Sequence, residues 1–159
     1  MSTSIQVVYP SKTVKETRAG AFVVHKNDGS IVTWPSLQTT LSTFNEVKSD
    51  LKTEVNQIFT TSIAWAALKN DGSVVTWGGD GRGGDSRSVS ELLSGNVIDI
   101  SATDSSFAAL KNDGSVVAWG LAYNLTYDHS TKWDLNSLLD KEVSTIVSSS
   151  NSFAALKND

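Results

Sequence analysis

The chain has 159 residues, a formal net charge of −4 and no cysteine. This length is enough for one compact domain with a core, residues 1–159, but is short for two domains. The charge balance includes no concentrated basic face, which disfavours nucleic acid and anionic membranes as partners, and the absence of cysteine excludes disulfides, thiolate metal sites and a cysteine nucleophile.

The first eight residues contain no basic region followed by an apolar one. No later stretch approaches the roughly 20 apolar residues of a membrane-spanning helix. We therefore expect a soluble protein without a classical secretion signal, cytoplasmic by default.

A short hairpin pattern recurs four times along the chain. Its turns are marked by Asp28, Asp71, Asp113 and Asp159, at spacings of 43, 42 and 46 residues. The best-preserved copy, residues 66–78, reads AALKNDGSVVTWG and describes two strands around a tight Asn-Asp-Gly turn. A period near 43 residues is typical of propeller blades and of helical solenoids. The β-branched and aromatic residues favour blades.

The two ends of the chain look complementary. Residues 4–10 resemble residues 30–35, the second half of the first hairpin, with one extra residue, whereas the last copy, residues 153–159, has only the first half. The N-terminal segment is therefore expected to supply the missing strand and to close about four blades into a ring. Residues 11–20 lack the apolar positions of the later connections. The first blade is then degenerate, or the open edge pairs with another chain, so both a monomer and a strand-exchanged homodimer stay open.

The connections between hairpins also repeat. In the connection before the third hairpin, Val89 and Leu93 lie four residues apart and Gly95 follows them, which predicts one or two helical turns. Residues 97–102 then read as a strand. Each repeat is thus a strand, a hairpin, a loop and a short helix. The approximate repeat boundaries are 11–35, 36–78, 79–120, and 121–159 together with 1–10.

Both faces of the hairpin strands are apolar. In the third copy, Phe107 and Ala109 point to one side, and Ala108 and Leu110 point to the other. A strand buried on both faces needs a neighbouring sheet on each side, which stacked blades provide. The sequence therefore predicts an all-β, small β-propeller-like repeat domain with short helices between the blades.

The pattern A-L-x-x-D-G-x-V-x-x-W-G, at residues 67–78 and 109–120, resembles the repeat signature of the regulator of chromosome condensation (RCC) family. The resemblance implies β-propeller blades. The guanine-nucleotide exchange activity of the best-known members is not implied, because it resides in loops outside the repeat signature.

Two irregular segments carry the candidate ligand-binding residues. The glycine-rich loop 78–85 contains Asp80, Arg82 and Asp85. Its carboxylates are possible calcium ligands, although a surface turn is the simpler interpretation. The insertion 121–133 accounts for the longest repeat spacing, and irregular loops on a regular scaffold are where binding usually occurs. It supplies the candidates Tyr123, Tyr127, His129 and Trp133.

No catalytic constellation emerges from the remaining polar and aromatic residues. The repeated Trp34, Trp77 and Trp119 could stack on sugar rings, but a tryptophan at the end of a core strand more often packs between blades. His25 and His129 have no serine elbow or paired carboxylate at a motif spacing. We therefore expect neither an enzyme nor a metal or cofactor site, but a non-catalytic scaffold that binds a protein through its inter-blade loops. The alternative is a carbohydrate-binding, lectin-like propeller module.

Overall fold

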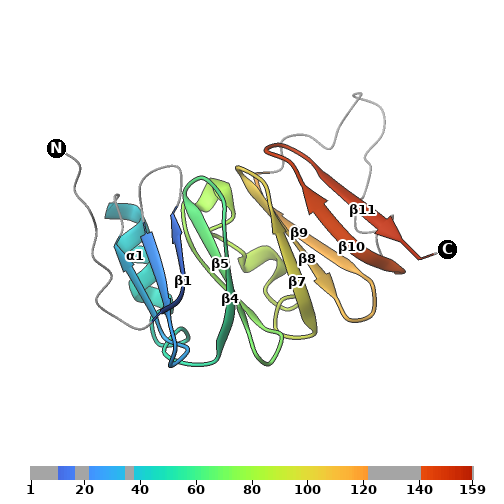
Figure 1. Cartoon of the computed structure of the whole chain (residues 1–159). Coiled ribbons are helices and arrows are strands. Elements are labelled where there is room, and N and C mark those ends of the chain that lie inside the picture. The colour runs from blue at the N-terminus through green and yellow to red at the C-terminus, as the bar shows by residue number, and fades with distance from the viewer. Residues whose placement is uncertain (1–10, 17–21, 35–37, 122–140, 159) are drawn as a thin grey trace.

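The computed structural model describes residues 11–16, 22–34, 38–121 and 141–158. These residues form four small antiparallel sheets, which follow one another along the chain (Figure 1). The sheets are β1 (Ser11–Glu16), β2 (Phe22–Lys26) and β3 (Ile31–Trp34); β4 (Val55–Thr60), β5 (Ala64–Lys69) and β6 (Val74–Gly78); β7 (Val97–Ala102), β8 (Ser106–Lys111) and β9 (Val116–Gly120); and β10 (Val143–Ser148) with β11 (Phe153–Lys157). The predicted all-β, blade-like architecture is confirmed.

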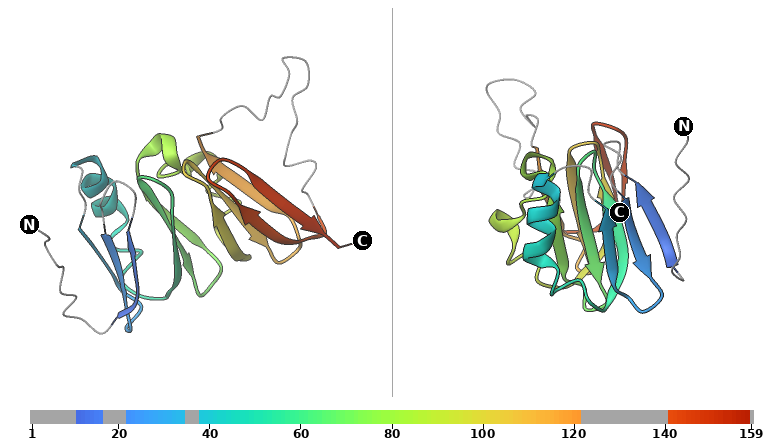
Figure 2. Two further views of the ribbon diagram at one scale, coloured as in Figure 1. Left: turned by 45° about the horizontal axis from the view of Figure 1, so that its top comes forward. Right: turned by 90° about the vertical axis from the view of Figure 1, so that its left-hand side faces the viewer.

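The sheets stand side by side in a row and pack face to face (Figures 1 and 2). Each central strand contributes to two hydrophobic clusters, because its successive side chains point to opposite faces. In β5, Trp65 and Ala67 pack toward the first sheet, while Ala66 and Leu68 pack toward the third. Strand β8 divides its side chains in the same way between the second and third clusters. The predicted burial of both strand faces is therefore confirmed for β5 and β8.

The Asp-Gly turns between the second and third strands of the blades connect neighbouring sheets. In each turn, the Asp carboxylate accepts hydrogen bonds from the backbone N–H and the hydroxyl of the serine two residues on, as Asp113 does from Ser115 at 3.0 and 2.6 Å. Gly114 has φ +79°, and a Cβ there would lie 2.6 Å from the backbone nitrogen of Glu142 in the next blade. Glycine is needed at this position for its backbone conformation and for the close approach of the neighbouring blade.

Short helices lie between blades, as predicted. The 3₁₀ turns η1 (Asp80–Arg82) and η2 (Arg87–Val89) precede the third sheet. Leu93, which is 2% exposed, anchors the turns that follow η2 in the core. The corresponding connection before the second sheet forms a full helix, α1 (Gln38–Val47). It packs beside β6, where the rings of Phe44 and Trp77 form a T-shaped pair with centroids 5.9 Å apart.

The segment expected to form a degenerate first connection, residues 11–20, begins with strand β1, which pairs with β2. Backbone hydrogen bonds suffice for this pairing, so the strand forms without the apolar pattern of the later repeats.

The described sheets form a row whose two ends do not meet. The first sheet and the β10–β11 sheet lie at its opposite ends (Figure 2), and among the described strands β11 pairs only with β10. Ring closure is not seen in this arrangement. The predicted closing segment, residues 4–9, lies outside the described residues, so its pairing with β11 stays a prediction. Within the described ranges, no helix is long and apolar enough to cross a membrane.

Candidate interaction surfaces

The glycine-rich loop 78–85 is packed between the second and third sheets. Its carbonyl oxygens accept three hydrogen bonds from side chains: Arg82 from Thr61 Oγ1 (2.9 Å), Gly83 from Trp119 Nε1 (3.0 Å) and Gly84 from Thr76 Oγ1 (3.0 Å). A Cβ at Gly83 would lie 2.6 Å from Cδ2 of Phe107. The glycines therefore allow the backbone to approach the neighbouring blade closely, and these three carbonyl groups already have partners.

The charged candidates of this loop do not converge on one point. Asp85 forms a two-point ion pair with Arg87, through Oδ1 to Nε at 2.9 Å and Oδ2 to Nη2 at 2.6 Å. Hydrogen bonds from the Arg87 side chain, then from its backbone N–H, lower the pKa of Asp85 to about 2. Asp80 is exposed and Arg82 is half-buried. In the part of the chain that the structure describes, no three His, Asp or Glu side chains are grouped so that they could hold a metal ion.

The tryptophan rings at the ends of β6 and β9 are core residues. Trp77 is fully buried and stacks on Trp65, with ring centroids 5.8 Å apart. Trp119 is 7% exposed and stacks on Phe107 at 5.2 Å. Packing between blades, the interpretation favoured from the sequence, is therefore confirmed for Trp77 and Trp119. Neither ring has a free face for a sugar.

The turns between the first and second strands of three blades form a polar surface, which we call the turn face. It consists of residues 60–62, 102–104 and 148–150, and these line a groove of about 480 Å³ in which every residue except Ala102 is polar. Equivalent hydroxyls close the three turns: Thr61, Thr103 and Ser149 accept hydrogen bonds from the backbone N–H groups of Ala64, Ser106 and Ser152. These hydrogen bonds give the three turns the same closed conformation.

Backbone hydrogen bonds join the turns of neighbouring blades. The N–H of Ser62 donates to the carbonyl of Asp104 at 3.0 Å, and the N–H of Asp104 donates to the carbonyl of Ser150 at 2.8 Å. Within the described residues, the N–H of Ser150 has no such acceptor. The turn face therefore has a fixed spacing, and in the described part of the chain it ends at the N–H of Ser150, which has no backbone acceptor.

Both irregular segments predicted from the sequence begin at the turn face. The loop 78–85 is attached by the N–H of Gly79 to the carbonyl of Ile63 at 2.9 Å. The insertion starts at Leu121, whose N–H donates to the carbonyl of Ser105 at 2.9 Å. Its candidate residues Tyr123, Tyr127, His129 and Trp133 themselves lie outside the described residues.

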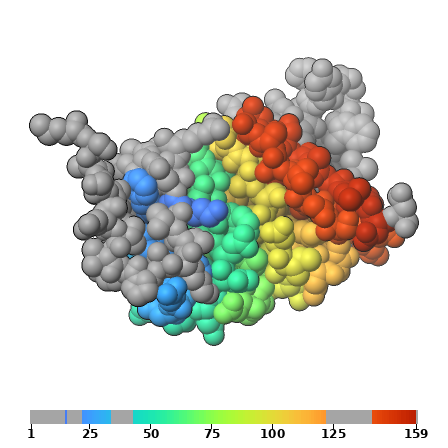
Figure 3. All heavy atoms as spheres, in the orientation of Figure 1, coloured from blue at the N-terminus to red at the C-terminus, as the bar shows by residue number. Residues whose placement is uncertain are grey.

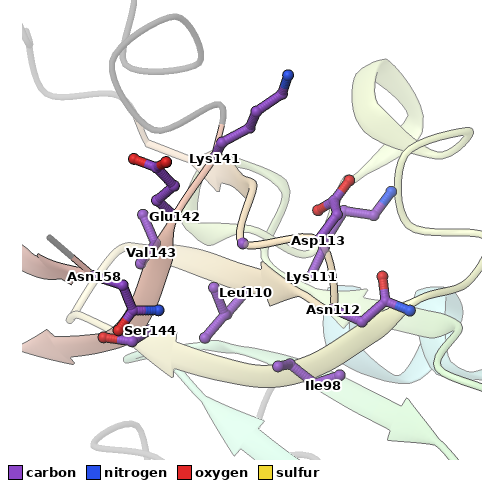
Figure 4. A pocket seen from close by; sticks show the side chains of 11 residues that line it. Ile98, Leu110, Lys111, Asn112, Asp113, Lys141, Glu142, Val143, Ser144 and Asn158 are labelled. Carbon is purple, nitrogen blue, oxygen red and sulfur yellow. The ribbon is translucent and has the colours of Figure 1, made fainter.

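A second groove, of about 360 Å³, lies at the opposite end of the blades, between the third and fourth sheets. Figure 4 shows that it is bordered by the β8–β9 turn and the start of β10, with Lys111, Asp113, Lys141 and Glu142 around an apolar floor of Leu110 and Val143. Both signs of charge are interspersed around it. Because positive and negative side chains alternate around the groove, it favours neither an anionic nor a cationic ligand.

The chain matches no protein-family profile and no curated protein sequence. Among solved structures it is similar to human WBSCR16, with 22% identity and a TM-score of 0.42 over 63% of this chain and 32% of that one. It is also similar to Prp20, the RCC1 protein of the yeast Saccharomyces cerevisiae, with 18% identity and a TM-score of 0.48 over 73% of this chain and 32% of that one. Prp20 bound to Kap60 matches at 17% identity and a TM-score of 0.48, over 74% of this chain and 31% of that one. Yeast RCC1 belongs to the RCC family, whose repeat signature the pattern at residues 67–78 and 109–120 resembles. This chain spans about a third of the length of these proteins.

Sequence reasoning missed the turn face. Its signal is present, since a Ser or Thr stands at the equivalent positions Thr61, Thr103 and Ser149. Single hydroxyl residues between apolar strands are common in turns, however, and only the packing of the blades shows that the three lie side by side.

Proposed function

We propose that this chain is a non-catalytic binding scaffold that holds a protein partner at its turn face. The observation that carries the proposal is the convergence of three features at one end of the blades. These are the hydroxyl-lined groove, the glycine-rich loop 78–85 and the base of the insertion at Leu121. Binding residues are commonly found on loops that a rigid framework positions.

The chemistry of the turn face suits an extended polypeptide. Its groove offers hydroxyl groups, and the N–H of Ser150 is an unused backbone donor within the described chain. A peptide backbone presents carbonyl acceptors and N–H donors that match these groups. The apolar residues of the repeat are not part of this surface, because they are used in packing between blades.

The described carboxylates with displaced pKa values stabilise local turns. The carboxylates with displaced pKa values are Asp28, Asp71, Asp113 and Asp85. Asp28, Asp71 and Asp113 each accept a hydrogen bond from a serine hydroxyl in their own turn, and Asp85 is paired with Arg87.

Selection of a random peptide library against the intact chain tests the proposal. The selected peptides should lose affinity about 10-fold or more with Ser62→Arg or Ser150→Arg, since either change fills the groove with a large charged side chain. Asn70→Arg, an exposed position at the opposite end of the blades, is the matched control and should leave binding unchanged.

Two results would contradict the proposal. Peptides that bind equally well to both turn-face variants would place the site elsewhere. Failure to select peptides, together with glycan-array binding that is lost on Trp133→Ala, would instead support the carbohydrate-binding alternative.

A further inference from the structure

A single carboxylate lies in the groove of the turn face. Among the described residues that line this groove, Asp104 is the charged one, and the others are serines, threonines and Ala102. A surface that presents one negative charge and no positive charge is complementary to a ligand with a positive charge. The charge of the lining therefore narrows the chemistry of the partner.

Asp104 occupies the middle of three equivalent positions. Ser62, Asp104 and Ser150 each follow the hydroxyl residue that closes the turn. Figure 3 shows the sheets that carry these turns, in green, yellow and red, adjoining one another. Because hydrogen-bonded segments lie about 5 Å apart, the backbone of Asp104 is about 5 Å from that of each serine. The acidic residue is thus flanked by a serine in each neighbouring turn.

The backbone of Asp104 is held from both sides. Its N–H donates to the carbonyl of Ser150 at 2.8 Å, and its carbonyl accepts from the N–H of Ser62 at 3.0 Å. Its chain neighbours Thr103 and Ser105 are buried, and the Thr103 hydroxyl accepts a hydrogen bond from the N–H of Ser105 at 3.2 Å. The carboxylate is therefore presented from a fixed backbone, which reduces the ordering that binding requires.

A guanidinium group matches this arrangement. A carboxylate offers about four acceptor sites, so Asp104 can hold a ligand in addition to the interaction that it makes within the chain. Guanidinium pairs with a carboxylate through two parallel hydrogen bonds, and its remaining N–H donors suit hydroxyl oxygens such as those of Ser62 and Ser150. We propose that the turn face binds an extended segment of a protein partner through an arginine side chain that pairs with Asp104. This pairing rests on the proposed function, because it takes place in the same groove.

Other ligand classes fit the groove less well. None of the described lining residues is aromatic, so a sugar finds no ring there on which to stack. A phosphate-bearing ligand is repelled by the carboxylate, and the formal net charge of −4 acts in the same direction. An arginine-bearing peptide avoids both difficulties.

Two synthetic peptide libraries test the preference for positive charge. Both contain random uncharged residues around a fixed central residue, which is arginine in one library and glutamate in the other. Selection against the intact chain should yield binders from the arginine library and none from the glutamate library at the same stringency. Replacing the arginine of a selected peptide by citrulline, its uncharged analogue, should weaken binding about 10-fold or more.

Asp104→Ser tests the residue itself. Serine stands at the equivalent positions 62 and 150, so the change removes the charge and keeps a residue that this turn accepts. The variant should bind the selected peptides about 10-fold or more weakly. Replacing arginine by citrulline should then have little further effect, because the two groups act on each other.

Asp99→Ser is the matched control. It removes the same charge from the same blade, at an exposed position about 16 Å away along β7. This separation exceeds the Debye length of about 8 Å at physiological ionic strength. The control variant should therefore bind the selected peptides as the parent does.

Three outcomes would overturn the proposal: no binders from the arginine library, equally tight binders from the glutamate library, or selected peptides that are indifferent to Asp104→Ser. If the selected peptides still lose affinity with Ser62→Arg, the turn face remains the binding site and only the pairing with arginine fails. Peptides that keep their affinity with Ser62→Arg would instead contradict the proposed function. The two failures are thus distinguishable.

Discussion

Strands β8 and β11 offer a comparison within one molecule. Their eight-residue sequences are identical from Ser106 and from Ser152 onward, and both pair antiparallel with a preceding strand in the same register pattern. In β8, Phe107, Ala108, Ala109 and Leu110 are buried, but in β11 the residues that follow Phe153 are exposed.

The difference comes from the neighbours. Strand β8 is covered by the second sheet on one face and by the fourth on the other. Within its own sheet it pairs with β7 along one edge and with β9 along the other. Among the described strands, β11 pairs with β10 alone. The same side chains therefore contribute very different amounts of hydrophobic free energy at the two places, because that contribution follows the apolar area removed from water.

The leucine of each strand gives the largest expected contrast. Leu110→Ala should lower the free energy of unfolding by about 2–5 kcal/mol, since the buried leucine leaves a cavity. Leu156→Ala should change it by about 0.5 kcal/mol or less, as is usual at exposed positions. Both are measured by chemical denaturation. Equal losses would contradict the exposure of Leu156 in the described structure.

The glycine that follows β8 sharpens the comparison at the junction between blades. Gly114→Ala combines a positive φ with a contact of 2.6 Å to the backbone of Glu142, so we expect a loss of about 1–3 kcal/mol or more. At Gly81, a Cβ meets nothing within 4 Å, and Gly81→Ala should stay within about 0.5 kcal/mol of the parent in thermal or chemical unfolding. A Gly114→Ala chain as stable as the parent would show that the blades move apart without cost.

Trp77 in β6 and Trp119 in β9 test how much the third strand of a blade contributes to stability. Trp119→Phe leaves the carbonyl of Gly83 without its hydrogen-bond donor, which should cost about 1–3 kcal/mol in addition to the lost ring area. Trp77→Phe is the matched control, because Nε1 of Trp77 is buried and has no partner among the described residues. Denaturation of both variants measures the difference. A larger loss for Trp77→Phe would contradict the assigned role of the Gly83 hydrogen bond.

The smallest expected effect is that of Ser115→Ala on stability in acid. The hydroxyl and then the N–H of Ser115 hold the pKa of Asp113 below its ordinary value of 3.8. The stabilisation is complete above that value and is lost as the pH falls through the lower pKa of the folded chain. Ser115→Ala should move the pKa of Asp113 upward in an NMR titration and reduce the acid dependence of unfolding below pH 3.8.

The control for the acid experiment is Ser144→Ala, whose hydroxyl donates to the carbonyl of Leu156 and not to a carboxylate. It should leave the Asp113 titration unchanged. An Asp113 pKa that does not respond to Ser115→Ala would contradict the assigned cause.

Much of the fold could be predicted from the chain, and less of the candidate site. The hairpins follow from alternating apolar residues and from the Asp-Gly turns, which are local signals. The loop 78–85 illustrates the limit. Its glycines indicate a flexible turn in the sequence, whereas in the structure Gly83 lies against Phe107 and binds Trp119, residues of a blade that comes later in the chain. The turn face was missed for the same reason, since its three parts are more than 40 residues apart.

The sequence by itself determined the repeat, the hairpins and the need to cover both faces of each central strand, because these depend on side-chain periodicity over a few residues. Only the tertiary structure decided which copies are covered. Residues 106–113 and 152–159 contain no difference that could distinguish a buried strand from an exposed one. Burial is a property of the neighbouring sheets. The described blades place such sheets on both faces of β8, whereas β11 lies in the last sheet of the row.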